Sequence, residues 1–459
     1  MQTNNHTKII RTRIAPSPTG FLHIGTARTA FFNYIFAKQN NGQIILRIED
    51  TDKDRSKKEF EDSIVNGFEW LNIKFDETYR QSDRTEIHKK YLESLLAADK
   101  AFLSKEQDQD TGAAAGKRSE VIRFRNPREK ISFEDKVRGT VEFDTAELGD
   151  FVIAKSLDEP LYNFAAVVDD FEMNISHIIR GEDHISNTPR QILLQEALGL
   201  PRPIYAHLPL ILSSDRSKMS KRGGAKDICQ YKETGYLPEA LLNYLILLGW
   251  NPGTEQEIFS FEELLEKFDL TKIQKGGAVF DAQKLNWVNK EYIKLLDSEN
   301  FKQKVLEFLP EANKKMAAAD NGKFEKILPL IRERIEKFED VGELSRAGDL
   351  NYYFVQPKYE TEKLLWKGEN DLTRVKTRFE KICKLLEKVS DFSADNLKRN
   401  IWPFAEEEGR GAVLWPMRYA LSGKDKTPDP FSLAEILGKE ETIKRLNYAI
   451  QKIISTNNT

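Results

Sequence analysis

Cysteine is nearly absent from this chain of 459 residues, which contains only Cys229 and Cys383. Two cysteines so far apart exclude the disulfide framework of small secreted domains, and they also exclude a zinc site built on paired cysteines. Such sparse cysteine usage is typical of proteins in a reducing compartment, so we expect a cytoplasmic location.

Long apolar runs are missing too. No stretch approaches the roughly 18 apolar residues of a membrane-spanning helix, and the polar residues 1–10 lack the apolar segment of a secretion signal. We therefore expect no spanning segment and no membrane partner. Hydrophobic residues make up 40% of the chain and charged residues 31%, which is typical of a folded globular protein; this length predicts two to four domains.

A large excess of either charge is also lacking, because the formal net charge is only −3. This value gives no sign of nucleic-acid binding. It does not exclude such binding, since local basic faces determine the field near a protein surface.

The first part of the chain alternates between strand and helix patterns. Strand patterns over residues 8–14 and 43–48 flank a helix pattern over about residues 26–36. Further apolar residues then recur at helical spacing: Phe60, Ile64, Phe68 and Leu71. Strands that alternate with helices predict a parallel, doubly wound sheet.

The pattern becomes less regular after Tyr91, and we interpret the stretch up to Val167 as an insertion into the sheet domain. It contains an expected loop over residues 108–116 and strand patterns over 121–124 and 137–143.

Helix and strand patterns then resume. Thr188-Pro189-Arg190-Gln191 has the sequence of a helix capping box, and Gly199 is expected to end that helix. Residues 205–212 predict a strand that leads into a loop over 213–224.

The chain after Asp227 is expected to be mostly helical. Apolar residues at alternating steps of three and four between residues 372 and 389 predict an amphipathic helix, and residues 433–454 predict one or two more.

A glycine-flanked turn, Gly20-Phe21-Leu22-His23-Ile24-Gly25-Thr26, stands between the first strand and the first helix. A helix N-terminus offers free N–H groups and a positive dipole end to a phosphate, and His23 can donate a hydrogen bond to a phosphate oxygen. The spacing of Gly20 and Gly25 imitates a P-loop, but Thr26-Ala27 replaces its Lys-Ser/Thr pair, which argues against a P-loop NTPase. An ordinary turn with a solvated histidine is the alternative.

A second segment, Ser217-Lys218-Met219-Ser220-Lys221-Arg222-Gly223-Gly224, combines three cations with small residues. Such a loop can close over a triphosphate, because lysine is a compact charge suited to the charge that develops on pyrophosphate. A solvated basic loop is the alternative.

Together these segments resemble the paired signatures of the class I aminoacyl-tRNA synthetases, through residues 13–20, 23–26 and 218–222. Further blocks are similar to the glutamyl branch: residues 47–52, 162–170, 180–184 and 236–241. The resemblance is specific over about the first 290 residues. It is looser afterwards, where residues 416–423 match.

The resemblance implies an α/β Rossmann-type catalytic domain with an α+β insertion, followed by mostly α-helical C-terminal domains. The catalytic domain would cover residues 1–91 and 168–227, and an acceptor-end-binding insertion would cover 92–167. A stem-contact domain over 228–300 and a helical anticodon-binding region of two subdomains over 301–459 would follow.

The implied activity is glutamate–tRNA ligation. Glutamate reacts with ATP, supplied with Mg²⁺, to give glutamyl-adenylate, and the glutamyl group passes to tRNA(Glu). The implied partners are therefore ATP, L-glutamate and tRNA(Glu), and nothing in the sequence demands more than a monomer.

The resemblance also assigns residues to the two substrates. ATP would be held by His23, Gly25, Thr26, Lys218, Met219, Ser220, Lys221 and Arg222. Of these, the catalytic set would be His23, Lys218 and Lys221. Glutamate would be held by Arg13, Ala15, Ser17, Glu49, Tyr162 and Arg180. Arginine suits a carboxylate because its planar guanidinium forms two parallel hydrogen bonds.

Each arginine has a structural alternative. Arg13 could be a surface residue on an edge strand, and Arg180 could close an ion pair with Glu182 or Asp183. A calcium loop is a further alternative at Asp50, Asp52, Asp54 and Glu61. It is disfavoured because Arg55 occupies the position that needs glycine.

Some members of the family carry a Cys/His zinc site in the acceptor-end insertion. Here residues 92–167 contain neither cysteine nor histidine, so a tetrahedral N/S site cannot be built from them. We predict no zinc in this insertion.

Three rival functions remain in view. A short paralogue that glutamylates a base of tRNA(Asp) lacks the anticodon region, whereas this chain continues with a long helical part. A glutaminyl enzyme would place β-barrels there. An inactivated regulatory relative would be expected to lose nucleotide-site residues, and both signatures are intact.

Overall fold

The computed structural model describes residues 9–105, 120–219 and 226–457. The chain divides into two compact units, one up to Tyr292 and one from Ile293 onward. No helix in the described ranges is long and apolar enough to cross a membrane.

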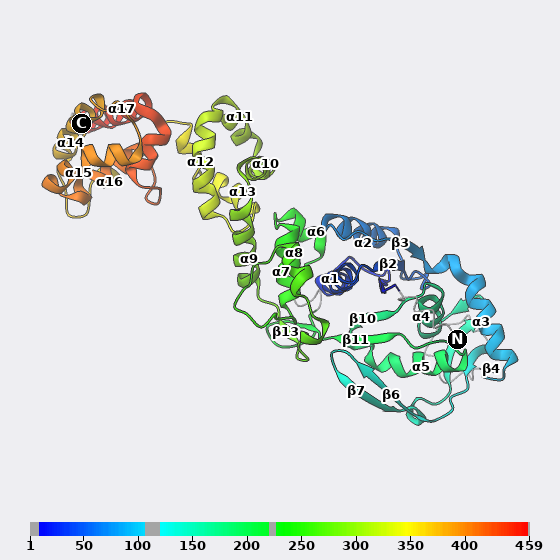
Figure 1. The fold of residues 1–459 in the computed structure, drawn as a ribbon. Coiled ribbons are helices and arrows are strands. Elements are labelled where there is room, and N and C mark those ends of the chain that lie inside the picture. The colour runs from blue at the N-terminus through cyan, green and yellow to red at the C-terminus, as the bar shows by residue number, and fades with distance from the viewer. Residues whose placement is uncertain (1–8, 106–119, 220–225, 458–459) are drawn as a thin grey trace. The chain divides into compact units, whose positions relative to one another are not determined.

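The first unit is built on parallel strands (Figure 1). β2 pairs with β1 on one side and β3 on the other, and β10 pairs with β11. β1 also lies beside β10, because the backbone N–H of Ser176 donates to the carbonyl of Arg11 at 2.9 Å. The bounds are β1 Arg11–Ile14, β2 Gln43–Ile48, β3 Glu77–Arg80, β10 His177–Gly181 and β11 Ile204–Leu208.

The strand order is therefore β3-β2-β1-β10-β11. This is a doubly wound order that reverses direction between β1 and β10. The predicted α/β fold class is confirmed.

Helices cover this sheet as the apolar pattern requires. The expected helix after the first strand is α1, and Ala27, Phe31 and Ile35 on it are at most 2% exposed. The turn back into β2 needs Gly42, since a Cβ atom there would lie 2.3 Å from the carbonyl oxygen of Ile10. The bounds are α1 Ile24–Gln39, α2 Lys58–Trp70, α3 Thr85–Ala97, α4 Tyr162–Glu172 and α5 Thr188–Ala197.

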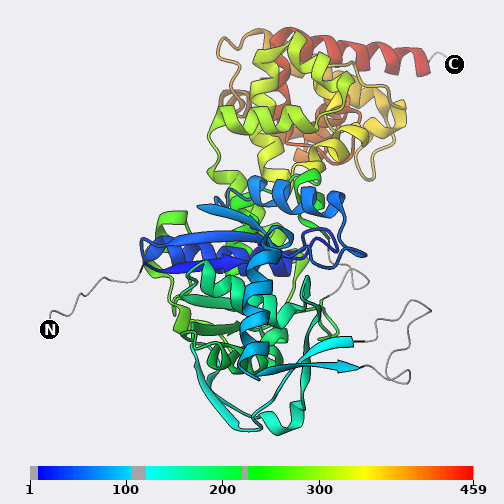
Figure 2. The same ribbon diagram turned by 90° about the vertical axis from the view of Figure 1, so that its right-hand side faces the viewer.

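The stretch interpreted as an insertion contributes strands to two sheets. β4, β5, β8 and β9 form an antiparallel sheet of their own; β4 and β5 lie side by side in Figure 2. β6 instead joins the parallel sheet next to β11, and β7 follows it. The bounds are β4 Ala101–Lys105, β5 Glu120–Phe124, β6 Lys130–Asp135, β7 Gly139–Asp144, β8 Phe151–Ser156 and β9 Glu159–Pro160.

The strand predicted over 121–124 is confirmed, and the one predicted over 137–143 begins later, at Gly139. Residues 136–138 form the turn after β6, where Asp135 accepts the backbone N–H groups of Val137 and Arg138. The loop predicted over 108–116 lies outside the described residues.

Two local predictions are wrong. The strand predicted over 205–212 is broken into β11 and β12 (Ile211–Leu212), because proline at 209 has no N–H for a ladder and its carbonyl accepts from Arg28. The capping box at Thr188 is not formed either. α5 begins without a side-chain cap, and the Thr188 hydroxyl instead serves Arg180. Gly199 ends this helix as predicted, with φ at +67°.

Short elements complete the first unit. A helix predicted to follow Asp227 begins there with a full capping box between Asp227 and Gln230. The bounds are η1 Gln81–Arg84, η2 Thr145–Leu148, η3 Glu182–Asn187, α6 Ile228–Glu233, α7 Pro238–Leu247, α8 Phe261–Lys267, η5 Leu270–Lys272 and β13 Ala278–Val279. α9, Ala282–Leu295, spans the boundary of the two units.

The described part of the second unit is mostly helical, as predicted. The helix expected from the three-four pattern is α14, and Val375, Phe379 and Ile382 on it are fully buried. The pattern over 433–454 belongs to α17, which kinks at Gly438. The bounds are α10 Ser298–Phe308, α11 Glu311–Ala319, α12 Asn321–Arg334, α13 Glu339–Arg346, η6 Asn351–Tyr353, η7 Thr361–Leu364, α14 Leu372–Glu387, α15 Ala394–Glu408, α16 Arg410–Ser422 and α17 Pro430–Asn457.

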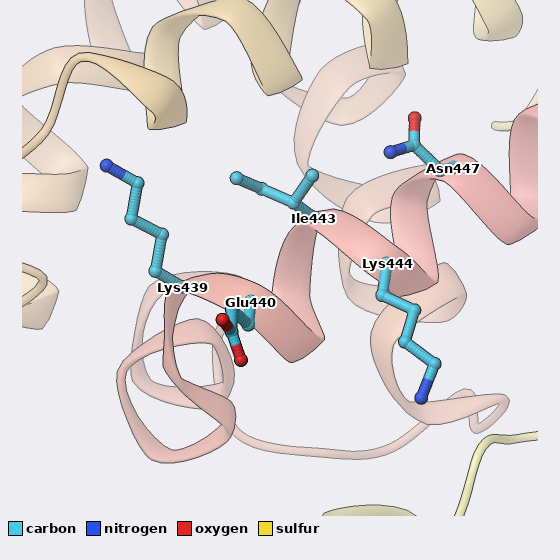
Figure 3. Close-up of a pocket in the computed structure, with 5 residues that line it drawn as sticks. All are labelled: Lys439, Glu440, Ile443, Lys444 and Asn447. Atoms are coloured by element: carbon cyan, nitrogen blue, oxygen red, sulfur yellow. The ribbon is translucent and has the colours of Figure 1, made fainter.

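A buried cation holds this helical unit together. Arg445 on α17 donates to the carbonyl oxygens of Tyr352, Leu421 and Val355. It thereby satisfies carbonyls at the ends of η6 and α16 that would otherwise be buried without a donor. Close by on the same helix, a wide hollow of about 570 Å³ is lined by Lys439, Glu440, Ile443, Lys444 and Asn447 (Figure 3).

Candidate active site at the switch point of the sheet

A cleft of about 620 Å³ lies at the carboxyl ends of β1 and β10. The strand order changes direction here, and open α/β sheets bind their ligands at this position. Every candidate residue that the structure describes lines the cleft: Arg13, Ala15, Ser17, His23, Gly25, Thr26, Glu49, Tyr162, Arg180, Lys218 and Met219. Ser220, Lys221 and Arg222 lie outside the described residues.

One wall of the cleft is the start of α1. His23 is the N-cap of this helix, and its Nδ1 accepts the backbone N–H of Gly25 at 3.1 Å. The Thr26 hydroxyl lies 3.2 Å from His23 Nε2. A Cβ atom on residue 25 would approach the His23 ring to 3.0 Å, so the close packing of the ring favours glycine there. The positive dipole end of the helix can attract an anion in the cleft.

A buried network of charges around Arg47 supports Arg13 and Glu49, which line the cleft. This guanidinium is fully buried and lies 2.9 Å from Glu49 Oε1 and 2.7 Å from Asp170 Oδ1. The same Asp170 oxygen accepts from Arg13 Nε at 3.1 Å. Arg13 is only 4% exposed, so it is not the surface residue of the structural alternative.

The network determines the charges that face the cleft. Burial would raise the pKa of Asp170, but Arg13 and Arg47 hold that pKa below its ordinary value. Burial does raise the pKa of Glu49, although Arg47 and Arg13 oppose the shift. Glu49 binds Arg47 through Oε1, and any further cation that enters the cleft would stabilise its ionised form.

Arg180, the last but one residue of β10, is held on one edge of its guanidinium. Its Nε lies 3.1 Å from His207 Nε2, and its Nη2 donates to the Thr188 hydroxyl at 2.8 Å. Its Nη1 is buried and has no hydrogen-bond partner within the part of the chain that the structure describes. A buried, unpaired guanidinium nitrogen in a cleft is a site for an anionic ligand.

The ion pairs proposed as the alternative for Arg180 are not formed. Glu182 pairs with Arg138, and Asp183 pairs with Lys218 at 2.7 Å. Arg180 itself has no carboxylate partner among the described residues, and burial lowers its pKa from the ordinary value.

Tyr162 and His184 form the side of the cleft next to Arg180. The Tyr162 hydroxyl lies 3.1 Å from His184 Nδ1. Burial, with the nearby positive charge of Arg180, lowers the pKa of His184 to about 4. This imidazole is therefore neutral at pH 7 and adds no positive charge to the cleft.

Cations engage Asp50, Asp52 and Glu61 of the carboxylates that imitate a calcium loop. Arg80 donates to both Asp50 and Glu61, and Asp52 pairs with Arg55. Across the described ranges, no group of three or more His, Cys, Asp or Glu side chains is arranged to hold a metal ion.

Sequence reasoning missed three residues that organise the cleft: Arg47, Thr188 and His207. Arg47 and His207 each stand inside an otherwise apolar strand, and a polar group in such a strand must find a buried partner. That signal could have found both. No local signal distinguishes Thr188 from a helix cap.

Comparisons with known proteins identify the family of this chain. A family model described as tRNA synthetases class I (E and Q), catalytic domain, matches residues 9–111 and 103–287. A second model, described as an anticodon binding domain, matches residues 300–450.

Relatives resemble the chain over nearly its whole length. It is 39% identical to glutamate–tRNA ligase 1 of Petrotoga mobilis, covering 96% of this chain and 98% of that protein. It is also 39% identical to glutamate–tRNA ligase 1 of Caldanaerobacter subterraneus, covering 97% and 98%. A crystal structure of a glutamate tRNA ligase from Elizabethkingia meningosepticum in complex with its amino acid matches with a TM-score of 0.83 and 33% identity, covering 97% of this chain and 99% of that one. The chain belongs to the glutamate–tRNA ligase family of class I tRNA synthetases.

Proposed function

We propose that this protein activates glutamate with ATP to form glutamyl-adenylate and transfers the glutamyl group to the 3′ end of tRNA(Glu), releasing pyrophosphate and AMP. One observation carries the proposal. A single cleft joins a helix N-terminus suited to phosphate to two buried arginines suited to carboxylates.

ATP lies on the α1 side of the cleft in this proposal. His23, Gly25 and Thr26 hold it at the helix start, and Lys218 and Lys221 neutralise the charge that develops on the departing pyrophosphate. Met219, Ser220 and Arg222 complete that loop. Lys218 is bound to Asp183 at 2.7 Å, so contact with a triphosphate exchanges one anionic partner for another.

Glutamate lies against Arg13 and Glu49 in this proposal. Arg13 and Arg180 bind its carboxylates, Glu49 binds its ammonium group, Ala15 and Ser17 contact its backbone atoms, and Tyr162 bounds the side-chain pocket. The unpaired Nη1 of Arg180 supports this orientation, because an anionic ligand would satisfy it.

Mg²⁺ accompanies the ATP in this scheme. The cleft carboxylate Glu49 is engaged by Arg47 and is assigned to the ammonium group of glutamate, so phosphate oxygens are the natural ligands of the magnesium ion. A magnesium ion bound there would offset the negative charge of the triphosphate.

For the domains, we propose a Rossmann-type catalytic domain over residues 1–91 and 168–227 and an acceptor-end insertion over 92–167. A stem-contact domain over 228–300 and an anticodon-binding region over 301–459 follow. We propose a monomer that works in the cytoplasm.

The decisive measurement is ATP–pyrophosphate exchange with and without tRNA(Glu). We expect exchange that depends on glutamate, together with formation of glutamyl-tRNA(Glu). Exchange that depends on glutamine instead would favour the glutaminyl branch of the same family. A protein that glutamylates only tRNA(Asp), or that supports no exchange, would contradict the proposal.

The protein is expected to work without zinc, because residues 92–167 offer no cysteine or histidine. Protein purified without a metal-affinity tag should contain no stoichiometric zinc in elemental analysis. Exchange assayed with excess Mg²⁺ should survive a zinc-selective chelator, and one zinc ion per chain would contradict this expectation.

A further inference from the structure

The side chain of Arg180 is supported by a relay that begins in β6. Asp135 Oδ2 lies 2.6 Å from His207 Nδ1, and His207 Nε2 lies 3.1 Å from Arg180 Nε. All three side chains are at most 5% exposed. Arg180 and His207 are register partners on the parallel strands β10 and β11, so their side chains leave the same face of the sheet.

The direction of each hydrogen bond in the relay follows from chemistry. A guanidinium has donors only, so His207 Nε2 must accept from Arg180 and cannot carry a proton. The single proton of a neutral imidazole then sits on Nδ1, where it donates to Asp135. His207 is therefore assigned as the neutral Nδ1–H tautomer.

The carboxylate of Asp135 is held by backbone groups as well as by His207. Its Oδ1 accepts the backbone N–H groups of Val137 and Arg138 at 2.9 and 2.8 Å. These bonds and His207 hold the pKa of Asp135 below its ordinary value, against the effect of burial. The carboxylate is thus ionised and held at the turn that ends β6.

Other groups around His207 keep the imidazole neutral. Burial lowers its pKa, and the positive charges of Arg180 and Arg138 act in the same direction, while Asp135 opposes them. Tyr205 stacks beside the ring, with centroids 6.2 Å apart, and Arg180 lies over the same Tyr205 ring.

Thr188 completes the support. Its hydroxyl oxygen accepts from Arg180 Nη2 at 2.8 Å, and its proton can go to His207 Nε2 at 3.1 Å or to the carbonyl of His184 at 3.3 Å. Two of the three guanidinium nitrogens are then bound on one edge, and Nη1 is the nitrogen without a partner among the described residues.

We propose that His207 is a positioning residue of the glutamate pocket: as an acceptor fixed by Asp135, it orients Arg180 so that Nη1 meets a carboxylate of glutamate. This inference rests on the proposed function, because it takes glutamate as the ligand of the cleft. It adds a polar relay that links the pocket to a strand within residues 92–167.

The first test is the tautomer itself, measured without any substrate. The chain has six histidines, so ¹⁵N-histidine labelling gives a small set of ring signals, and the set from His207 is identified by its loss in His207→Gln. We expect the Nδ1–H pattern at pH 7 in the wild-type protein. An Nε2–H or doubly protonated ring would overturn the relay.

The second test compares two substitutions at His207 in ATP–pyrophosphate exchange. His207→Phe keeps a planar ring but removes the acceptor, so we expect the KM for glutamate to rise about tenfold or more while the KM for ATP stays within about twofold. His207→Gln can offer its amide oxygen to Arg180, and we expect it to recover most of the glutamate affinity. Equal KM values for glutamate in the wild type and His207→Phe would overturn the proposal.

Asp135→Asn is a nearly isosteric test of the same relay. Its oxygen can still accept the backbone N–H groups of Val137 and Arg138, but its amide would donate to His207 Nδ1 and drive the proton to Nε2. We expect the NMR pattern to switch to Nε2–H and the KM for glutamate to rise at least as much as in His207→Phe. An unchanged tautomer with an unchanged KM would contradict the inference.

Wild-type exchange separates this inference from the function on which it rests. If the wild type supports no glutamate-dependent exchange, the proposed function is wrong. The inference that His207 orients Arg180 toward glutamate is then wrong as well, even if the tautomer of His207 is as assigned. If the wild type is active and only the variants behave unexpectedly, the relay alone is wrong.

Discussion

Arg180→Gln is expected to raise the KM for glutamate by about 10- to 100-fold and to leave the KM for ATP nearly unchanged. The variant removes a charge-assisted hydrogen bond to a carboxylate in a closed site, and such bonds contribute about 1.5–3 kcal/mol. The KM for ATP should not change, because ATP is proposed to bind at the α1 side of the cleft without contacting Arg180. Steady-state ATP–pyrophosphate exchange over a range of each substrate measures both constants.

Discrimination against glutamine is expected to fall in the same variant. Glutamate and glutamine are nearly the same shape, so charge rather than size must separate them. The amide of glutamine would turn an N–H donor toward the guanidinium and leave that donor unpaired, a mismatch that costs about 1–3 kcal/mol. The substitution Arg180→Gln removes this mismatch. The ratio of kcat/KM values for the two amino acids reports this change.

Arg202→Gln is the matched control. Arg202 pairs with Glu196 at the surface and does not line the cleft, so its removal should leave both Michaelis constants at wild-type values. Thermal unfolding of both variants tests whether the buried substitution has disturbed the fold. Wild-type glutamate kinetics in a folded Arg180→Gln protein would assign Arg180 a structural role and move the carboxylate contact elsewhere.

Lys221→Ala is expected to slow adenylate formation by about 10²–10³-fold, because one positioned charge is removed from the developing pyrophosphate. The apparent affinities for glutamate and tRNA(Glu) should change far less, since the charge acts mainly in the transition state. Pre-steady-state formation of glutamyl-adenylate with saturating substrates isolates this step.

Lys232→Ala on α6 provides the control for Lys221→Ala. It removes the same charge from an exposed helix that does not line the cleft, and we expect unchanged adenylate formation. A Lys221→Ala enzyme as fast as this control would place the triphosphate contact on another residue of the loop.

Local sequence patterns predict much of the secondary structure of this molecule. The apolar run over residues 43–48 became β2, and the three-four spacing from Leu372 became α14, because the periods of strand and helix are properties of short segments. The candidate residues around His23 could also be predicted, since a glycine turn at a helix start has the groups that can bind phosphate within a few residues of one another.

Two local predictions were wrong, for different reasons. Thr188 has the sequence of a helix cap, yet its hydroxyl binds Arg180, which faces it from the neighbouring strand. Proline at 209 interrupts a predicted strand and offers its carbonyl to Arg28 on α1. At Thr188 a tertiary partner competes with the local one, whereas the missing N–H of proline is a property of the sequence itself.

The sequence by itself determined the class of fold, the family and the list of residues able to meet ATP and glutamate, because each of these depends on residue type and short-range order. Only the tertiary structure decided how those residues are oriented. Arg13 and Glu49 are joined through Arg47 and Asp170, far apart along the chain, and the free nitrogen of Arg180 is determined by His207 on another strand. Buried charges must find partners in space, and the choice of partner depends on the packing of the whole sheet.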